Sequence, residues 1–245
     1  MDFNFDYAKE WNESAQLFWE QGGYEWLSVQ LDGFATIFEL GCGTGQSTLA
    51  LLEKAHNVIA VDKNPHCLDL AEKKVQAYSR NGTGLVNKKT GEVQFVEADY
   101  TDWNFTNQFL PQQSIDAIAC WNVGTAGDAN VLADYRELWE HFGYSKEETR
   151  KNPASVYNST MCLCACLLGQ RMNTPVNIVF RSPSDISCEI IDYYTNIKDE
   201  MKFSDVIIRS RKTTSLSSGG RLLAVNNQVS HQKTMDLFLI SILLK

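Results

Sequence analysis

Three glycines stand at alternate positions in the stretch IFELGCGTGQSTLALL, at Gly41, Gly43 and Gly45. An apolar segment precedes them and an amphipathic helical pattern follows, so they lie where a strand turns into a helix. A tight turn needs only one glycine. Three of them indicate that a ligand lies against the backbone, where the N-terminus of the next helix also offers unpaired N–H groups.

The spacing of these glycines excludes two common ligand loops. A dinucleotide loop reads G-x-G-x-x-G, but its sixth position here is Gln46. A phosphate loop ends in Gly-Lys-Ser/Thr, and this sequence does not follow. Glu39, just before the glycines, would repel a phosphate and attract an amine or a sulfonium. The pattern therefore favours a cationic ligand.

Strand-like apolar segments alternate with helical patterns through most of the chain, which is typical of a parallel α/β sheet. Near-continuous apolarity predicts that these strands are buried on both faces. The expected strands cover residues 36–41, 57–62, 93–99, 115–122 and 176–182. The first expected helices cover residues 46–54 and a segment that opens near Asn64-Pro65, where proline suits the first helical position.

Two segments depart from this alternation. About fifty residues separate the fourth and fifth strands, which is long for a crossover. We expect a polar helix at 129–142 and an apolar helix at 155–171 there. After residue 200, two long apolar strands flank the segment SSGGRLLAVNNQ. This pattern predicts an antiparallel pair of strands and not another crossover. We expect one domain, residues 1–245.

The segment FELGCGTG resembles the first motif, (D/E)-x-G-x-G-x-G, of class I S-adenosylmethionine-dependent methyltransferases. The resemblance implies a doubly wound, Rossmann-like, mostly parallel seven-stranded sheet with C-terminal antiparallel strands. It also implies that the cofactor is S-adenosylmethionine and the product S-adenosylhomocysteine. Asp62 ends the second strand, where the carboxylate of this family binds both ribose hydroxyls. Glu39 and the three glycines would contact the methionine part.

The same resemblance assigns residues at the ends of the later strands. Asp99 would lie near the adenine amino group, and Tyr100 would cover the ring. Two alternatives stay open, because Asp62 could cap the following helix and Asp99 could satisfy a turn. The other residues that the resemblance implies for the cofactor site are Cys42, Lys63, Trp121 and Asn122.

The acceptor site is implied only by position. The resemblance places a helical cap over the cofactor, made of residues 1–33 and of an insertion at 123–174 that could serve as a substrate lid. Tyr7 and His141 are the candidate catalytic residues in these segments, although each could equally be a packing or surface residue. No catalytic base is assigned.

Charge favours a small-molecule acceptor over a nucleic acid. The chain has a net charge of −8, which opposes binding to a polyanion. Residues 201–245 are the exception, with seven Lys or Arg against two acidic residues, and Arg209, Arg211 and Lys212 are the densest group. Two alternatives remain, namely an RNA or protein methyltransferase that uses this basic region, and a non-catalytic module that binds S-adenosylmethionine.

Cysteine usage and hydropathy suggest the compartment. Seven cysteines without regular spacing are typical of reduced thiols, and the acidic N-terminus lacks a signal-peptide pattern, so we expect a cytoplasmic protein. No segment approaches the roughly 20 apolar residues of a membrane helix. Cys162, Cys164 and Cys166 are expected to pack inside a helix, so no metal site is predicted.

Overall fold

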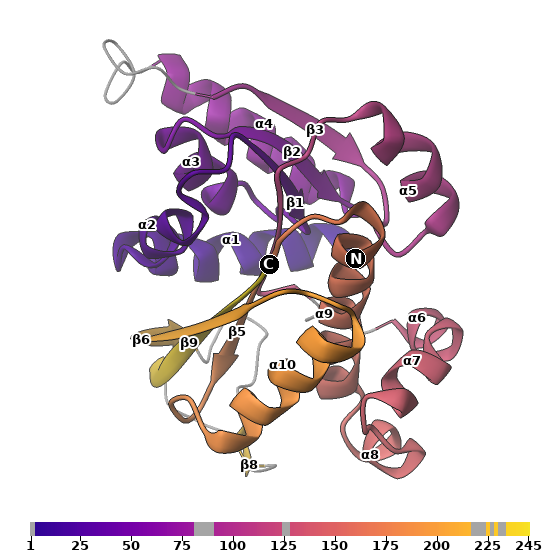
Figure 1. The fold of residues 1–245 in the computed structure, drawn as a ribbon. Coiled ribbons are helices and arrows are strands. Elements are labelled where there is room, and N and C mark those ends of the chain that lie inside the picture. Colours follow the sequence, from indigo (N-terminus) through magenta and orange to yellow (C-terminus); the bar gives the residue numbers. More distant parts are fainter. Residues whose placement is uncertain (1–2, 81–90, 124–127, 217–223, 226–227, 230–233) are drawn as a thin grey trace.

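The computed structural model describes residues 3–80, 91–123, 128–216, 224–225, 228–229 and 234–245. Its centre is a seven-stranded sheet in the order β3-β2-β1-β4-β5-β9-β6 (Figure 1). The seven strands are β1 (Thr36–Leu40), β2 (Asn57–Asp62), β3 (Val93–Glu97), β4 (Ala117–Trp121), β5 (Val176–Ser182), β6 (Val206–Leu216) and β9 (Thr234–Leu244). A second, two-stranded sheet pairs β7 (Ala224–Val225) with β8 (Gln228–Val229).

The strand directions confirm the expected fold class. Strands β1 to β5 run parallel, and β9 lies antiparallel between β5 and β6. The strand order reverses at β1, which pairs with β2 on one side and β4 on the other. Loops diverge at such a switch point and leave room for a ligand at the carboxyl ends of the strands. A site is therefore expected where β1 and β4 end.

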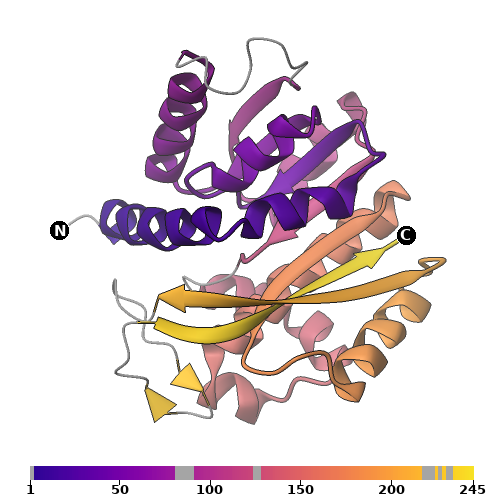
Figure 2. The ribbon, with the colours of Figure 1, turned by 90° about the vertical axis from the view of Figure 1, so that its left-hand side faces the viewer.

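Helices cover both faces of the sheet (Figures 1 and 2). One face carries α1 (Phe3–Glu20), α2 (Gly23–Ser28), the 3-10 turn η1 (Val29–Leu31), α3 (Gln46–Glu53) and α4 (Pro65–Arg80). The other carries α5 (Trp103–Phe109), the 3-10 turn η2 (Leu110–Gln112), α6 (Ala129–Asp134), α7 (Arg136–His141), α8 (Lys146–Lys151), α9 (Pro153–Met172) and α10 (Cys188–Glu200). The two layers make the sheet the middle of a sandwich.

Each face of the sheet has its own apolar core. Neighbouring residues of β1, Ile37 and Phe38, are both fully buried but belong to opposite cores, because side chains alternate along a strand. All of β4 is buried in the same two-sided way. The expected burial on both faces is thus found for β1, β2 and β4, but β3, at the edge of the sheet, has no fully buried residue.

The N-terminal helices are attached to the far edge of the sheet. Arg211 of β6 donates hydrogen bonds to the carbonyl oxygens of Gly22, at 2.6 Å, and Gln21, at 2.7 Å. Gln21 in turn donates from Nε2 to the carbonyl oxygen of Thr214 at 3.0 Å. The carbonyl oxygen of Gly22 also accepts the first hydrogen bond of α2, from the N–H of Trp26 at 3.1 Å, so Arg211 binds at the junction of the two helices. The basic residues of β6 therefore hold the α1–α2 turn in place.

The segment between β4 and β5 differs in part from the expectation. The predicted polar helix is divided at Tyr135 into α6 and α7. The predicted apolar helix is α9, most of whose residues are buried against β4 and β5, so it is a crossover helix of the core. Helices α5 and α10 were not predicted. Their N-caps, Asp102 and Ser187, were the available signals.

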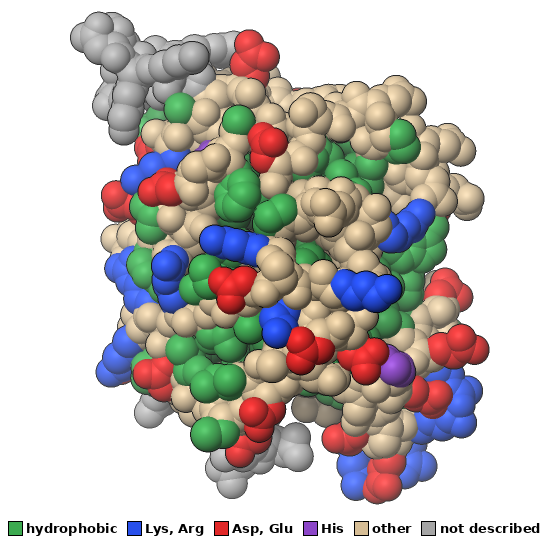
Figure 3. Space-filling model, in the orientation of Figure 1, with side chains coloured by type: hydrophobic (Ala, Val, Ile, Leu, Met, Phe, Trp, Pro, Cys, Tyr) green, Lys and Arg blue, Asp and Glu red, His purple; other side chains and the backbone are tan. Residues whose placement is uncertain are grey.

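Charged side chains of both signs are interspersed on the face shown in Figure 3. Among the exposed ion pairs of the described residues, Lys212 pairs with Asp236 at 2.8 Å. Among the described residues, each helix is too short or too polar to cross a lipid bilayer.

Replacing Arg211 with methionine is expected to lower the free energy of unfolding by about 1.5–3 kcal/mol, because the variant loses charged hydrogen bonds to two backbone carbonyls. Lys212→Met is the matched control on the next residue. Its exposed ion pair should contribute nothing measurable. Urea unfolding, followed by circular dichroism, measures the free energy of unfolding of both variants. Equal losses of stability would contradict the anchoring role of Arg211.

Candidate functional site

The glycine loop joins β1 to α3, and its three glycines have positive φ angles of 68°, 55° and 87°. A Cβ atom on Gly41 would stand 2.5 Å from Cγ1 of Val123, which follows β4. A Cβ on Gly43 would stand 2.4 Å from Nε1 of Trp11 in α1. The loop therefore lies in close contact with two segments that are distant in the sequence.

Gly45 has a packing role. A Cβ on this residue would stand 2.8 Å from the Cα of Ala71, so only glycine lets the start of α3 approach α4. The sequence had suggested that all three glycines face the ligand. Packing against Ala71 explains the glycine at position 45 without a ligand. Cys42, beside Gly43, is buried in the core of the α1 face.

Glu39 is a buried carboxylate at the end of β1. Its Oε2 accepts a hydrogen bond from the hydroxyl of Thr48 at 2.7 Å, while Oε1 has no hydrogen-bond partner among the described residues. Burial raises the pKa of Glu39 to about 7, against the lowering effect of hydrogen bonds from Ser47 and Thr48. A buried acid with a free oxygen would be stabilised in its charged form by a cation placed beside it.

Asp62 connects the end of β2 to the glycine loop. Its Oδ2 accepts a hydrogen bond from the backbone N–H of Gly43 at 2.9 Å, and its Oδ1 accepts one from Asn64 at 2.9 Å. Burial raises the pKa of Asp62, although these two hydrogen bonds oppose the shift. Each carboxylate oxygen keeps a further lone pair, so hydroxyls of a ligand can still be accepted.

Lys63 lies between two acids from different elements. Its Nζ is 3.2 Å from Oδ2 of Asp99, after β3, and 3.1 Å from Oδ2 of Asp128, the N-cap of α6. The other oxygen of Asp99 accepts hydrogen bonds from the backbone and hydroxyl of Thr101. The local turn that was the alternative for Asp99 is thus present. These contacts join β2, β3 and α6 at one edge of the site.

Asn122, directly after β4, has an unusual backbone and an unsatisfied side chain. Its φ is 56°, in the left-handed region, and only 6 % of the residue is exposed. Neither polar atom of its side-chain amide has a hydrogen-bond partner among the described residues. Leaving both atoms unpaired in the interior costs free energy, so this side chain is suited to a ligand. Strain of this kind concentrates at functional sites.

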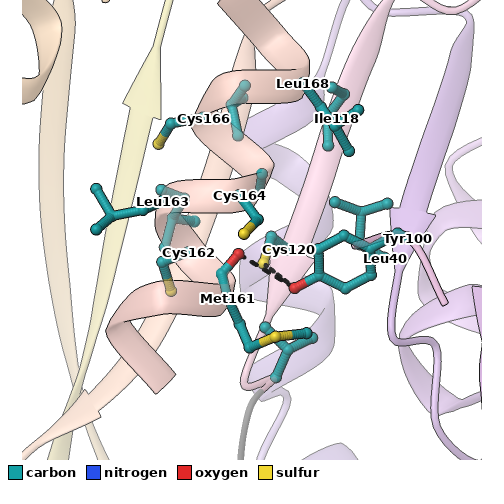
Figure 4. Packing of buried hydrophobic residues seen from close by; sticks show 14 of the residues in the cluster. Leu40, Tyr100, Ile118, Cys120, Met161, Cys162, Leu163, Cys164, Cys166 and Leu168 are labelled. Atoms are coloured by element: carbon teal, nitrogen blue, oxygen red, sulfur yellow. Dashed lines mark hydrogen bonds between the residues drawn. The ribbon is translucent and has the colours of Figure 1, made fainter. Parts of the chain in front are cut away.

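Trp121 and Tyr100 take places other than the expected ones. The indole Nε1 of Trp121 donates to Oδ1 of Asn177 at 2.7 Å, inside the core of the α1 face. The hydroxyl of Tyr100 donates to the carbonyl oxygen of Met161 in α9 at 3.1 Å (Figure 4). Both rings are buried in the core. The assignment of Tyr100 to an adenine face is therefore replaced by a packing role.

The N-terminal helix α1 covers the glycine loop. Trp11 lies against Gly43, and the guanidinium of Arg181, at the end of β5, lies 5.6 Å from the centre of the indole ring. Asn12 accepts hydrogen bonds from the side chains of Gln46, at 3.1 Å, and Lys74, at 2.8 Å. Sequence reasoning placed the segment 1–33 over the cofactor as a helical cap, and α1 lies there. The same reasoning missed Asn12 and Arg181, for which no local motif gives a signal.

The two candidate catalytic residues lie in different surroundings. Tyr7 is partly buried on α1, one helical turn before Trp11. His141 lies on α7 with its side chain 59 % exposed, and its Nε2 is 3.5 Å from Oε2 of Glu200. In Figure 1, α7 is on the opposite side of the molecule from α3 and the glycine loop. The structure does not bring His141 together with Glu39 and Asp62.

Cysteines Cys162, Cys164 and Cys166 are buried along α9, as the sequence predicts, and Cys164 is directed toward Cys120 and Tyr100 whereas Cys166 points away from them (Figure 4). Burial raises the pKa of Cys166 well above its ordinary value. These thiols are therefore apolar packing groups. Within the described part of the chain, no group of three or more His, Cys, Asp and Glu side chains is arranged to hold a metal ion.

Comparison with protein families gives a match over the N-terminal half of the sheet. Residues 37–141 match the family described as "Methyltransferase domain". The matched segment contains the glycine loop, Asp62, Asp99 and Asn122.

Two curated relatives match a similar part of the chain. Cypemycin N-terminal methyltransferase from Streptomyces sp is 37 % identical over 86 residues, which are 34 % of this chain and 29 % of the relative. Demethylmenaquinone methyltransferase from Lactobacillus johnsonii is 34 % identical over 90 residues, 36 % of this chain and 34 % of the relative. The match thus spans about a third of the length of these relatives.

Among solved structures, a putative RNA methyltransferase from Pyrococcus horikoshii matches with a TM-score of 0.49 and 11 % identity, over 91 % of this chain and 82 % of that chain. Magnesium protoporphyrin IX methyltransferase from Synechocystis PCC 6803 matches with a TM-score of 0.42 and 15 % identity, over 93 % of this chain and 79 % of that chain.

The free energy of unfolding is expected to fall as pH rises from about 4.5 to about 7. In the unfolded chain Glu39 ionises near its ordinary pKa of 4.5, whereas in the folded chain it ionises near 7. The folded state therefore holds more protons in this interval, and the fall amounts to at most about 3 kcal/mol.

Glu39→Gln should remove this part of the pH dependence, because glutamine does not titrate. Glu72→Gln, an exposed position on α4, is the control and should retain it. Urea unfolding at about pH 5 and about pH 8 measures the difference. The same pH dependence in Glu39→Gln as in the wild type would contradict the buried, protonated state of Glu39.

Proposed function

Because residues 37–141 belong to the methyltransferase domain family and the sheet has the class I, Rossmann-like order, we propose that this chain transfers methyl groups from S-adenosylmethionine to a small-molecule acceptor. The observation that carries the proposal is the pair of buried groups with unsatisfied polar atoms, Glu39 and Asn122, on the two sides of the glycine loop.

The residues at the carboxyl ends of the strands fit this cofactor. The carboxylate of Glu39 would repel a phosphate, and its negative charge suits the positive charge of the methionine part. Asp62 retains acceptor capacity for the two ribose hydroxyls. Lys63 and Asp99 form the polar edge at which the adenine amino group would lie. When bound, S-adenosylmethionine supplies a methyl group that is already electrophilic.

The remaining task of the protein is positioning. Holding two reactants in a reactive arrangement can by itself supply much of a rate enhancement. Asn122 offers a donor and an acceptor next to the glycine loop, and its left-handed backbone fixes their direction. Trp11 and Arg181 close the site from the α1 side and keep water from it. No base is required for a neutral amine acceptor.

The charge distribution supports a small molecule over RNA. In the densest basic group, on β6, both arginines are occupied by internal contacts, since Arg209 donates to Gln30 and Arg211 donates to Gly22, while Lys212 pairs with Asp236 at the surface. These side chains have little left to offer a phosphate backbone. Both curated relatives are named as methyltransferases that act on an N-terminus or on demethylmenaquinone. The first of these makes a peptide amine the second candidate acceptor.

Calorimetric titration of S-adenosylhomocysteine tests the proposal. The wild type should bind it with micromolar or tighter affinity, and Asp62→Ala should bind it at least about tenfold more weakly, because the ribose hydroxyls lose a charged acceptor. Asp69→Ala removes an exposed carboxylate on α4 and should bind like the wild type.

The absence of binding by folded wild-type protein would overturn the proposed function. Binding that is equally strong in Asp62→Ala would refute the assignment of Asp62 to the ribose. A screen of methyl acceptors, with small phenols, amines and a short peptide, would then separate the small-molecule acceptor from the peptide acceptor.

A further inference from the structure

A cavity of about 410 Å³ lies between α9, α10 and the end of β5, on the face of the sheet opposite to α1. We call it the α9–α10 cavity. Figure 1 shows the two helices beside each other. Small-molecule sites have volumes of about 300–1,000 Å³, so this cavity can hold a ligand of modest size.

The α9–α10 cavity adjoins the glycine loop through one short chain of contacts. Asn158, a lining residue on α9, donates a hydrogen bond from Nδ2 to the carbonyl oxygen of Val123. Val123 packs against Gly41. Asn122, with its unsatisfied amide, is the residue before Val123. The lining of the cavity is therefore in contact, through Asn158 and Val123, with the residues that border the glycine loop.

Aromatic rings form one wall of the cavity. Phe180 and Tyr194 are stacked with ring centres 6.0 Å apart, and Tyr193 meets Tyr194 edge to face at 5.1 Å. Tyr144 meets Tyr193 in the same way at 6.5 Å. Such a wall favours planar ligands, because offset stacks and edge contacts between rings add to the free energy of burial.

The polar groups of the cavity are hydroxyls and amides. Tyr144 donates its hydroxyl hydrogen to Ser159 at 2.6 Å. The hydroxyl of Tyr193 is buried and has no hydrogen-bond partner among the described residues. An unpaired buried hydroxyl is destabilising, and a hydroxyl on a ligand would satisfy it.

The interior of the cavity is neutral. Of its lining residues only Arg181 and Glu189 are charged. The guanidinium of Arg181 is directed to Trp11 on the other face, and Glu189 is exposed at the first turn of α10. A charged ligand would lose its hydration without gaining an ion pair, which costs several kcal/mol.

From these observations we infer that the α9–α10 cavity binds the methyl acceptor, and that this acceptor is a neutral, planar aromatic ring system with at least one hydroxyl group. This inference rests on the proposed methyl transfer. It adds the place and the chemical class of the acceptor, which the cofactor site alone does not give.

The first test compares two probes that differ by a hydroxyl, 2-naphthol and naphthalene, on protein saturated with S-adenosylhomocysteine. Tyr193→Phe should lower the affinity for 2-naphthol about tenfold, which is the usual contribution of one hydrogen bond. It should leave the affinity for naphthalene unchanged. Tyr78→Phe on α4 removes the same atom far from the cavity and should change neither affinity. Ligand fluorescence measures the affinity of all three proteins for each probe.

The second test fills the cavity. Ser159→Trp should abolish binding of 2-naphthol while the affinity for S-adenosylhomocysteine stays within about twofold, which also shows that the variant folds. If this variant does not fold, the comparison of Tyr193→Phe with Tyr78→Phe decides. The inference would be overturned if the wild type did not bind 2-naphthol, or if Tyr193→Phe lost affinity equally for both probes.

The result for S-adenosylhomocysteine distinguishes this inference from the proposed function. A wild type that binds S-adenosylhomocysteine but not 2-naphthol contradicts only the acceptor site. A wild type that does not bind S-adenosylhomocysteine contradicts the methyl transfer, and with it the role of acceptor, even where 2-naphthol binds.

Discussion

The shape of the candidate site depends on the carboxylate of Asp62. It accepts hydrogen bonds from the backbone of Gly43 in the glycine loop and of Asn64 before α4, so it connects three segments at the end of β2. Glycines with positive φ are the most mobile residues of an unfolded chain, and ordering them costs conformational entropy. A buried charged acceptor offsets part of this cost. The parallel pairing of β1 and β2 makes the contact possible, because it brings both carboxyl ends to one edge.

A second set of contacts closes the site from outside the sheet core. Trp11 and Asn12 of α1 meet the glycine loop and the start of α3, but α1 itself is positioned by Arg211 on β6. Helix α1, which covers the candidate site, is thus positioned by contacts at the β6 edge of the sheet. The α9–α10 cavity lies on the other face, so cofactor and acceptor would approach the end of β4 from different directions.

Much of the fold follows from the sequence, because strands buried on two faces are apolar at most positions and the glycine motif marks the switch point. The roles of Tyr100 and Trp121 could not be derived in this way. Both stand at the expected strand ends, but their partners, Met161 and Asn177, lie more than fifty residues further along. Helices α5 and α10 escaped prediction since α5 is only two turns long and the apolar residues of α10 include Ile191, which is exposed and blurs the helical pattern. Short-range patterns do not report such distant packing.

The position of β9 between β5 and β6 has a consequence for biosynthesis. Among the described strands β6 pairs only with β9, so during translation it has no strand partner until residues 234–244 have left the ribosome. Helix α1 is made first, yet Arg211, which binds its C-terminal end, lies on β6. The nascent chain can therefore assemble β1 to β5 before the end of its earliest helix is anchored. Such long-range closure slows folding and leaves apolar surface exposed meanwhile, which is when a chaperone would be needed.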